Sequence, residues 1–345
     1  MPQKGVLLVN LGSPDSTEVE DMKVFLREFL MDKNVIDAPY LIRKMIVEWF
    51  ILPRRPKQSA EAYRSIWRQD GSPLIVISRN LQRLIQANLD MPVALAMRYG
   101  NPSICAGLKQ LVEENGVDEI FLVPLYPHYA RATFETVVEK VRGELKKFAS
   151  GVRLSTIQPF FNEPAYIEAL TASAELELNW DYDHLLFSFH GLPERHVKKA
   201  DPTRNHCLKS AGCCSSPSPA HATCYRHQVL QTTDAFVRKM AIPQGRYSIA
   251  FQSKLGVDKW LEPSAASEIE RLARNGVNKL AVICPAFVSD CIETLEEIGI
   301  RGRETFLAAG GEELRLIPCM NDHPVWVETL TRYCEPKGVL EYTSS

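Results

Sequence analysis

Leu-Leu-Phe-Ser-Phe-His-Gly-Leu-Pro is the sequence of Leu185–Pro193, and it has the pattern of a buried strand that ends in a histidine. A short, nearly continuous apolar run is typical of a parallel strand that is covered on both faces. Such a strand carries His190 to its carboxyl end, where open α/β sheets build their sites. Gly191 permits a sharp turn, and Pro193 is expected to stop both strand and helix. A neutral imidazole there can accept a proton near physiological pH, although a histidine can also simply end a strand.

The same strand pattern occurs along the whole chain, and segments with helical spacing separate the strands. This alternation predicts an α/β fold with two similar halves, each with a parallel sheet flanked by helices. The boundary is expected near residue 160, which gives domains 1–160 and 161–345. The predicted strands are Gly5–Leu11, Pro92–Met97, Glu119–Pro124, Val152–Ile157, Leu185–Phe189, Tyr247–Gln252, Lys279–Cys284 and Glu313–Ile317.

The composition excludes several classes of protein. The 345 residues are 45% hydrophobic and 24% charged, with a net charge of −2, which is typical of a soluble globular protein without a general attraction for nucleic acid. The first residues run directly into a strand without a signal-peptide pattern, so we expect a cytoplasmic protein. No glycine-rich phosphate loop is present, so we expect no nucleotide cofactor.

A row of acids follows the predicted strand Lys279–Cys284. Asp290, Glu293 and Glu297 lie at positions i, i+3 and i+7, so one helix that is capped by Ser289 or Asp290 would carry them on one face. Acids near a helix N-terminus are ordinarily surface residues that complement the helix dipole. This row, however, belongs to the same half of the chain as His190. A base opposite carboxylates is suited to removing protons from a substrate or to passing a hydrated cation inward.

The segment Tyr40–Leu52 is an unusually apolar helix, YLIRKMIVEWFIL. Taken alone, it is either a core helix or an exposed apolar lip that faces a membrane or a flat ligand. Arg54 and Arg55 follow it directly and add two neighbouring positive charges.

Four of the nine cysteines, Cys207, Cys213, Cys214 and Cys224, are gathered in a loop rich in small residues and proline. Thiolates at this density indicate a metal site, either an iron–sulfur cluster or zinc. The spacing C-x5-C-C-x9-C fits neither the usual zinc pair nor the ferredoxin patterns, and free or disulfide-paired thiols also remain open. The other five cysteines are scattered and are expected to be reduced.

These motifs together resemble the ferrochelatases, which insert ferrous iron into a porphyrin to make haem. The resemblance runs almost from end to end, and its most specific parts are the histidine strand, Phe251–Gly256 and Asp290–Glu297. It implies a metal-inserting lyase with two Rossmann-like domains and an active-site cleft between them. The other matching pieces are Leu7–Pro14, Arg54–Pro56, Gly71–Pro73, Arg98-Tyr99, Pro124–Tyr129 and Trp260-Leu261.

The resemblance also assigns catalytic roles. His190 matches the residue that accepts the two porphyrin protons, and Glu293 matches its partner, so Fe²⁺ is expected at this pair. Asp290 and Glu297 match an acidic path that relays protons or delivers metal. In the family this helix has a π-type widening, which would bring the acids into one line.

The resemblance gives the apolar helix a function as well. Residues of about 40–56 match a lip that closes over the porphyrin and can touch a membrane, so a peripheral contact with the inner face of the cytoplasmic membrane is expected. Arg54 and Arg55 are placed to meet porphyrin propionates. Leu11 stands where the coproporphyrin-using, Gram-positive type has a tyrosine, which favours protoporphyrin IX as substrate and protohaem as product. The further expected porphyrin contacts are Ser72, Arg98, Tyr99, Tyr126 and Trp260.

Some microbial ferrochelatases have an internal insertion with cysteines, similar to residues of about 205–226 here, that binds a [2Fe–2S] cluster. The resemblance therefore favours such a cluster over zinc. Because iron insertion needs no electron transfer, the cluster would be structural or regulatory.

The alternative functions for the whole chain are a chelatase for a cobalt or nickel tetrapyrrole, a haem carrier without turnover and an iron–sulfur electron carrier. A carrier needs no proton acceptor, and an electron carrier would need a central cluster. The choice between monomer and homodimer stays open.

Overall fold

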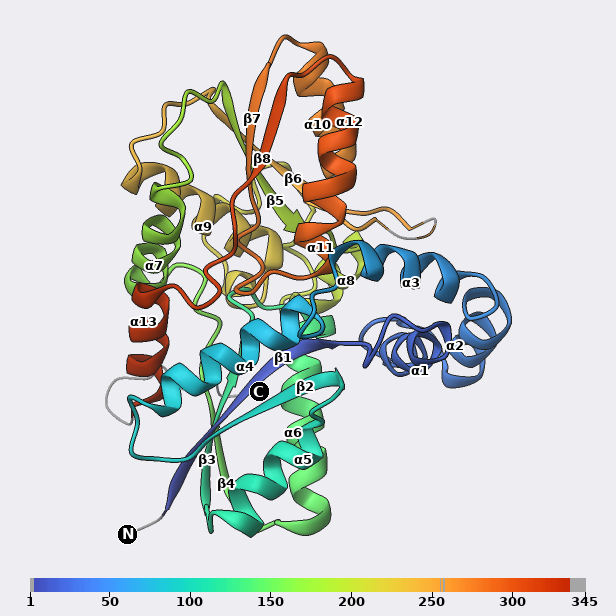
Figure 1. Cartoon of the computed structure of the whole chain (residues 1–345), viewed down its shortest axis with the longest axis vertical. Helices are drawn as coiled ribbons and strands as arrows, with labels where there is room; N and C mark the ends of the chain where they lie inside the picture. The colour runs from blue at the N-terminus through green and yellow to red at the C-terminus, as the bar shows by residue number, and fades with distance from the viewer. Residues whose placement is uncertain (1–2, 255, 257, 336–345) are drawn as a thin grey trace. The chain divides into compact units, whose positions relative to one another are not determined.

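The computed structural model describes residues 3–254, 256 and 258–335, and it contains two four-stranded sheets (Figure 1). Their strand orders are β2-β1-β3-β4 and β6-β5-β7-β8, and all the paired strands are parallel. This confirms the predicted α/β class with two similar halves. The strands are β1 (Lys4–Ser13), β2 (Val93–Gly100), β3 (Glu119–Pro124), β4 (Arg153–Thr156), β5 (His184–His190), β6 (Tyr247–Gln252), β7 (Lys279–Ile283) and β8 (Glu313–Leu316).

By its internal contacts, the chain divides into two units. Unit 1 contains residues 1–125 and 131–158, and unit 2 contains residues 126–130 and 159–326. Residues 327–335, which begin within the helix α13 (Pro324–Cys334), also belong to unit 1. The single boundary expected at residue 160 does not include the two short segments, 126–130 and 327–335, that belong to the other unit. The outer termini of the two predicted domains, residues 1–2 and 336–345, lie outside the described residues. Leu255 of the Phe251–Gly256 motif also lies outside them.

Unit 1 places helices on both faces of its sheet. The helix α4 lies on one side, and α5 and α6 lie on the other (Figure 1). The helices α1, α2 and α3 form a further group beyond the end of β1 (Figure 1). The helices are α1 (Val19–Leu30), α2 (Tyr40–Met45), η1 (Ile46–Ile51), α3 (Arg55–Ile66), α4 (Pro73–Gln86), α5 (Ile104–Lys109), η2 (Gln110–Glu114), η3 (Arg131–Glu135) and α6 (Thr136–Phe148).

Unit 2 repeats this arrangement. The helices α10 and α12 cover one side of the sheet, and α7 and α9 cover the other (Figure 1). Leu186 of β5 and Val282 of β7 have no exposed surface and pack against Ile269 of α10, which explains the apolar runs in the sequence. The helices are α7 (Pro164–Glu175), α8 (Glu194–Ala200), η4 (Pro219–Ala222), α9 (Tyr225–Lys239), α10 (Ala265–Arg274), α11 (Ile292–Leu295), η5 (Glu297–Gly302) and α12 (Arg303–Ala308).

The expectation that Pro193 stops a helix is wrong. Pro193 is the N-cap residue of α8, which begins directly after it at Glu194. A proline fits there because the first helical turn needs no hydrogen bond from its nitrogen, and its φ of −58° is already close to the helical value.

Candidate active site

The two motifs that were predicted to be catalytic follow neighbouring strands of the unit 2 sheet. The strand β5 lies in the middle, with β6 on one side and β7 on the other, so the chain order reverses between β5 and β7. The carboxyl ends of strands at such a switch point are where open α/β sheets bind their ligands. His190 is the last residue of β5, and the acidic segment follows β7.

His190 is held in one tautomer by its own loop. Its Nδ1 lies 2.7 Å from the carbonyl oxygen of Gly191. Because a carbonyl oxygen only accepts, Nδ1 carries the proton, and the lone pair of Nε2 is left to accept another. The ring of Phe287 lies edge-on to the imidazole at 6.3 Å. The partly exposed imidazole is therefore oriented as a base.

The turn after His190 requires glycine for reasons of space. A Cβ at Gly191 would lie 2.7 Å from the carbonyl oxygen of Gln252 and 3.1 Å from Cε3 of Trp260. The backbone nitrogen of Gly191 donates to that same carbonyl oxygen at 2.8 Å. The close approach ties the histidine loop to the end of β6, and the indole of Trp260 packs on it.

The acidic helix begins later than predicted. Its N-cap is Cys291, not Ser289 or Asp290, because Thr294 hydrogen-bonds back to the Cys291 nitrogen at 3.1 Å in a capping box. Asp290 therefore lies before the helix, and the i, i+3, i+7 argument does not apply to it. A π-helical turn, η5, starts at Glu297. The π-type widening that the resemblance implied is thus confirmed.

Asp290 is buried and its carboxylate accepts three hydrogen bonds. Asn321 donates to one oxygen at 2.7 Å, while Thr294 and the Cys319 nitrogen donate to the other at 3.0 and 3.3 Å. These bonds join the start of the acidic helix to the loop after β8.

Glu293 is the acid of the row that interacts with His190. Burial raises the pKa of its carboxyl, and the charge of His190 and a hydrogen bond with the Cys291 thiol act in the opposite direction. The negative charge of Glu297 raises the pKa further. Glu293 can therefore exchange a proton more readily near neutral pH than an exposed glutamate.

Gln252 fixes the backbone at Glu293. Its Nε2 donates to the Glu293 carbonyl oxygen at 2.6 Å, and its Oε1 accepts from the Ser188 hydroxyl at 2.8 Å. One side chain from β6 thus joins β5 to the acidic helix. Gln252 is part of the matching motif Phe251–Gly256, but its role is not evident from the sequence.

Ser253 holds Glu297 in the same way. Its backbone nitrogen donates to Oε1 of Glu297 at 2.7 Å, and its hydroxyl donates to Oε2 at 2.6 Å. The backbone of Ser253 has a φ of 65°, in the left-handed region that residues other than glycine rarely adopt. Ser253 belongs to the same motif, but its role is not evident from the sequence, because a single serine gives no signal of its partner 44 positions away.

A second histidine, His128, is completely enclosed within unit 2. The hydroxyl of Thr232 donates to the Phe161 carbonyl oxygen at 2.7 Å, so it accepts from Nε2 of His128 at 2.8 Å. Nδ1 of His128 is buried without a hydrogen-bond partner among the described residues. Burial lowers the pKa of His128 from 6.5 to about 3, so the ring is neutral at physiological pH.

This burial predicts an acid-sensitive stability. His128 binds a proton in the unfolded chain at a pKa of 6.5 but in the folded chain only at about 3. The unfolding free energy that depends on neutral His128 is therefore fully present above pH 6.5 and is lost as the pH decreases from 6.5 toward 3. Between pH 6.5 and 5, His128 should remove about 2 kcal/mol of unfolding free energy. The unfolding free energy, measured with denaturant at several pH values, should change less steeply with pH in His128→Gln than in the wild type. Equal dependence on pH in both proteins would contradict the prediction.

Unit 1 contains most of the expected porphyrin contacts. Leu11 is partly exposed in β1, and Ser72 is buried at the N-cap of α4. Arg98 forms an ion pair with the buried Asp32, and the Tyr99 hydroxyl donates to the same carboxylate at 3.0 Å. Tyr99 has no exposed surface. Arg98 and Tyr99 thus hold β2 to the segment after α1, and their porphyrin contact stays a prediction.

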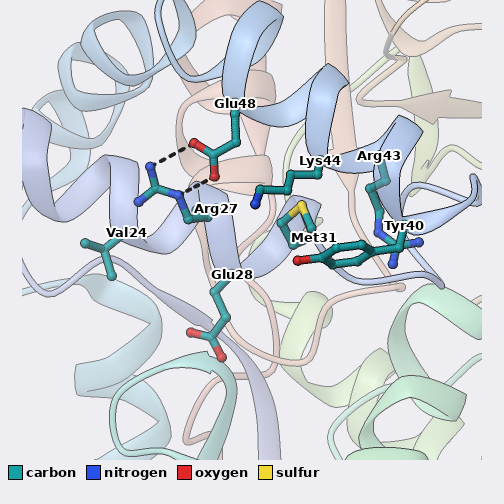
Figure 2. A pocket seen from close by; sticks show the side chains of 8 residues that line it. All are labelled: Val24, Arg27, Glu28, Met31, Tyr40, Arg43, Lys44 and Glu48. Carbon is teal, nitrogen blue, oxygen red and sulfur yellow. Dashed lines mark hydrogen bonds and ion pairs between the residues drawn. The ribbon is translucent and has the colours of Figure 1, made fainter.

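The apolar helix is exposed along most of its length, which excludes the reading as a core helix. Leu41 and Trp49 are 77% and 75% exposed, and α2 continues as the π-helix η1. A pocket of about 540 Å³ lies between α1 and this helix (Figure 2). Arg27 and Glu48 form an ion pair at 2.8 Å on its rim. No helix in the described part of the chain is long and apolar enough to cross a membrane.

The four clustered cysteines are buried together. The Sγ atoms of Cys213 and Cys214 are 4.0 Å apart, and the Cys224 thiol hydrogen-bonds with those of Cys207 and Cys214. The hydrogen bond with Cys214 lowers the pKa of Cys224 to about 6. Cys224 therefore reaches the thiolate form, which binds metal, near neutral pH.

Polar side chains hold the backbone of this segment. Asp201 accepts hydrogen bonds from the nitrogens of His206 and Cys207 at 2.8 and 2.9 Å. His206 and His221 both contact the Cys213 carbonyl oxygen, and His227 contacts that of Cys214. Within residues 3–254, 256 and 258–335, no three His, Cys, Asp or Glu side chains are arranged to hold a single metal ion.

The sequence matches one family over almost its full length. A sequence model described as Ferrochelatase matches residues 3–337. The chain is 52% identical over 340 residues to a ferrochelatase of Azotobacter vinelandii, which covers 98% of this chain and 100% of the relative. It is also 52% identical over 337 residues to a ferrochelatase of Pseudomonas fluorescens, which covers 97% of this chain and 98% of the relative.

Solved structures with little sequence identity share the fold. The sirohydrochlorin chelatase SirB of Bacillus subtilis subspecies spizizenii, in complex with cobalt, has a TM-score of 0.55 at 11% identity and covers 99% of this chain and 100% of its own. SirB from Bacillus subtilis with Fe³⁺ has a TM-score of 0.54 at 12% identity, with 96% and 95% coverage. At such identities, the likeness concerns the fold alone.

Proposed function

This chain belongs to the ferrochelatase family, and we propose that His190 and Glu293 carry out its reaction. The protein is a metal-inserting lyase that places Fe²⁺ into protoporphyrin and forms haem. The oriented Nε2 lone pair of His190 is the observation that supports the assignment best, because metallation must remove two pyrrole protons. Fe²⁺ enters as a substrate.

In this mechanism, Nε2 of His190 accepts a pyrrole proton. Glu293 stabilises the imidazolium that forms and takes part in releasing the proton, as its raised pKa suits. Fe²⁺ loses water as it meets the pyrrole nitrogens, and His190 and Glu293 can act as its protein ligands on the way. Binding energy from the rest of the porphyrin would bend the ring and expose those nitrogens.

Glu297 and Asp290 would extend the path beyond Glu293. Both carboxylates hold fixed hydrogen bonds, Glu297 with Ser253 and Asp290 with Asn321. Fixed acids suit a relay because they receive protons or a hydrated cation without rearranging. Glu297 is the nearer candidate, since its charge raises the pKa of Glu293.

The porphyrin would be held by the expected contacts in unit 1. Arg54 and Arg55 are exposed at the start of α3, where their guanidinium groups can meet carboxylates. Leu11 lacks the hydroxyl group of the tyrosine that the coproporphyrin-using type has at this position. Its absence supports protoporphyrin IX over coproporphyrin as the substrate. Tyr126 and Trp260 are the corresponding contacts proposed in unit 2.

The exposed apolar lip, residues of about 40–56, would touch a membrane from the cytoplasmic side. The large side chains of Leu41, Trp49 and Phe50 are all more than half exposed, and such a surface is suited to the interfacial region of a bilayer. The contact would be peripheral.

Anaerobic turnover with Fe²⁺ and protoporphyrin IX tests the function. The Soret and Q-band changes of metallation should appear with the purified protein. Binding without metallation at every Fe²⁺ concentration would instead indicate a carrier. Metallation of coproporphyrin alone would contradict the argument from Leu11.

We further propose that the four cysteines hold a [2Fe–2S] cluster. Four buried thiols in contact with one another supply the right number and type of ligands. A [2Fe–2S] cluster divides four thiolate ligands between two irons. When bound, it would cross-link the loop, and the reaction itself involves no redox step.

Replacing Cys213 by serine should remove the visible absorption of the cluster and its iron and sulfide content. The loss of a structural metal group should lower the unfolding free energy by about 2 kcal/mol, or the melting temperature by about 5 °C. Cys105→Ser is the matched control, since Cys105 lies in α5 outside this segment. A colourless wild-type protein that contains zinc, or four thiols that react freely after mild unfolding without any metal, would count against the cluster.

A further inference from the structure

The segment that carries the four cysteines is joined directly to the His190 loop. Cys224 is the N-cap residue of α9, and Tyr225 is the first residue of that helix. The Tyr225 hydroxyl donates a hydrogen bond of 2.7 Å to the backbone carbonyl oxygen of His190. The last cysteine of the segment and the proposed base are therefore separated by one residue and one hydrogen bond.

Tyr225 has little freedom to move. Its ring contacts the ring of His128 edge-on at 5.8 Å, and His128 in turn contacts Phe189 at 5.5 Å. Burial raises the pKa of Tyr225, so its phenol remains protonated and donates throughout the physiological range. The role of Tyr225 is not evident from the sequence, because no local pattern indicates a bond that spans 35 positions.

The bond from Tyr225 completes the anchoring of one peptide unit. The carbonyl oxygen of His190 accepts from Tyr225, and the nitrogen of Gly191 on the same peptide donates to Gln252. The next carbonyl, that of Gly191, accepts from Nδ1 of His190. A rotation of the first peptide would therefore displace the acceptor that orients the imidazole.

Two further contacts hold the cysteine segment near its C-terminal end, one to α9 and one to α8. Gln228, one turn along α9, donates to the Ala222 carbonyl oxygen at 2.9 Å and accepts from the Tyr129 nitrogen at 2.7 Å. The hydroxyl of Thr223 donates to the Ala200 carbonyl oxygen at 2.6 Å, at the end of the helix α8 that follows the His190 loop. These contacts fasten the C-terminal end of the segment, and Asp201 at the end of α8 holds its N-terminal end through the nitrogens of His206 and Cys207.

We propose that the first turn of α9 couples the order of the cysteine segment to the position of His190, with Tyr225 as the positioning residue. A group bound by the four cysteines fixes Cys224, and so fixes the start of α9 and the hydroxyl of Tyr225. When the segment loosens, the peptide after His190 loses a constraint and the imidazole is less well oriented. The inference rests on the proposed role of His190, and it gives the cysteine segment a regulatory function without electron transfer.

Tyr225→Phe tests the coupling with the smallest change, because it removes the hydroxyl and keeps the ring. We expect kcat to fall about five- to tenfold with little change in KM for porphyrin, which corresponds to the loss of one buried hydrogen bond. The cysteine-bound group should remain, as judged by the visible spectrum. Tyr166→Phe is the matched control, since the Tyr166 hydroxyl also donates to a backbone carbonyl, that of Pro285, at 2.9 Å. It should lower stability and leave kcat nearly unchanged.

Amide hydrogen exchange of the full chain without substrate gives a readout that does not depend on activity. Cys213→Ser and Tyr225→Phe should each speed exchange in the peptide that contains Gly191. The double variant should exchange no faster than the faster single one, since both changes act through the same bond. If Cys213→Ser abolishes the visible spectrum but leaves this exchange unchanged, the coupling is wrong.

The two proposals fail in different ways. If the wild type does not metallate porphyrin, the role of His190 is overturned while the exchange experiment still reports on the coupling. If the wild type is active and Tyr225→Phe retains full kcat, the positioning role of Tyr225 is overturned and the role of His190 stands.

Discussion

We expect the His190→Ala variant to lose kcat by a factor of about 10²–10⁴, the range for removal of a positioned general base. The hydrogen bond from Nδ1 to the Gly191 carbonyl oxygen leaves Nε2 as the atom with a free lone pair. Without this acceptor atom, the pyrrole protons must be transferred directly to water. Porphyrin binding should persist, because the contacts proposed for propionates and for the ring lie on other residues. Stopped-flow metallation and fluorescence titration of porphyrin measure the two effects separately.

Added imidazole provides a control for this variant. The alanine leaves a space the size of the lost ring, and free imidazole that enters it should restore part of the turnover, with a dependence on the concentration of its neutral form. A variant that only misfolds would not respond. Turnover within about tenfold of the wild type would show that His190 is not the main proton acceptor.

The strands of this protein were predictable because each is a short apolar run between turn residues. All eight predicted strands are present, and the bounds of β3 and β6 are the predicted ones. Burial on both faces of a parallel sheet leaves this mark in the local sequence. His190 was found for the same reason, since a strand that ends in histidine and glycine is also a local pattern.

The residues that hold the site could not be predicted in this way. Gln252, Ser253 and Tyr225 act through bonds to positions 35 to 44 residues away along the chain. A polar side chain in one motif does not name its partner in another, so the pairs appear only when the strands are assembled. The start of the acidic helix was mispredicted for another reason. Serine and aspartate are common N-caps, and the choice of Cys291 depends on the Thr294 side chain reaching back.

The second large effect concerns Glu293. We expect Glu293→Gln to lower kcat about 100-fold, because it keeps the shape of the side chain but removes the carboxyl group that interacts with His190. The loss should fall on kcat more than on KM for porphyrin, since a carboxylate that stabilises the imidazolium acts only as the proton moves. Steady-state metallation over a range of Fe²⁺ concentrations also shows whether KM for iron rises, as it would if Glu293 is a ligand on the iron path.

Glu296→Gln is the matched control for this change. Glu296 is the third residue after Glu293, but its carboxylate binds Arg301 through two hydrogen bonds of 2.7 and 2.9 Å. Its loss should reduce stability by about 1 kcal/mol and leave kcat near the wild-type value, because the carboxylate belongs to a structural ion pair. Equal effects of the two glutamine variants on kcat would mean that the helix responds to any lost charge. An effect confined to Glu293→Gln assigns the loss to the surroundings of Glu293, which include His190, since the carboxylate of Glu296 pairs with Arg301 instead.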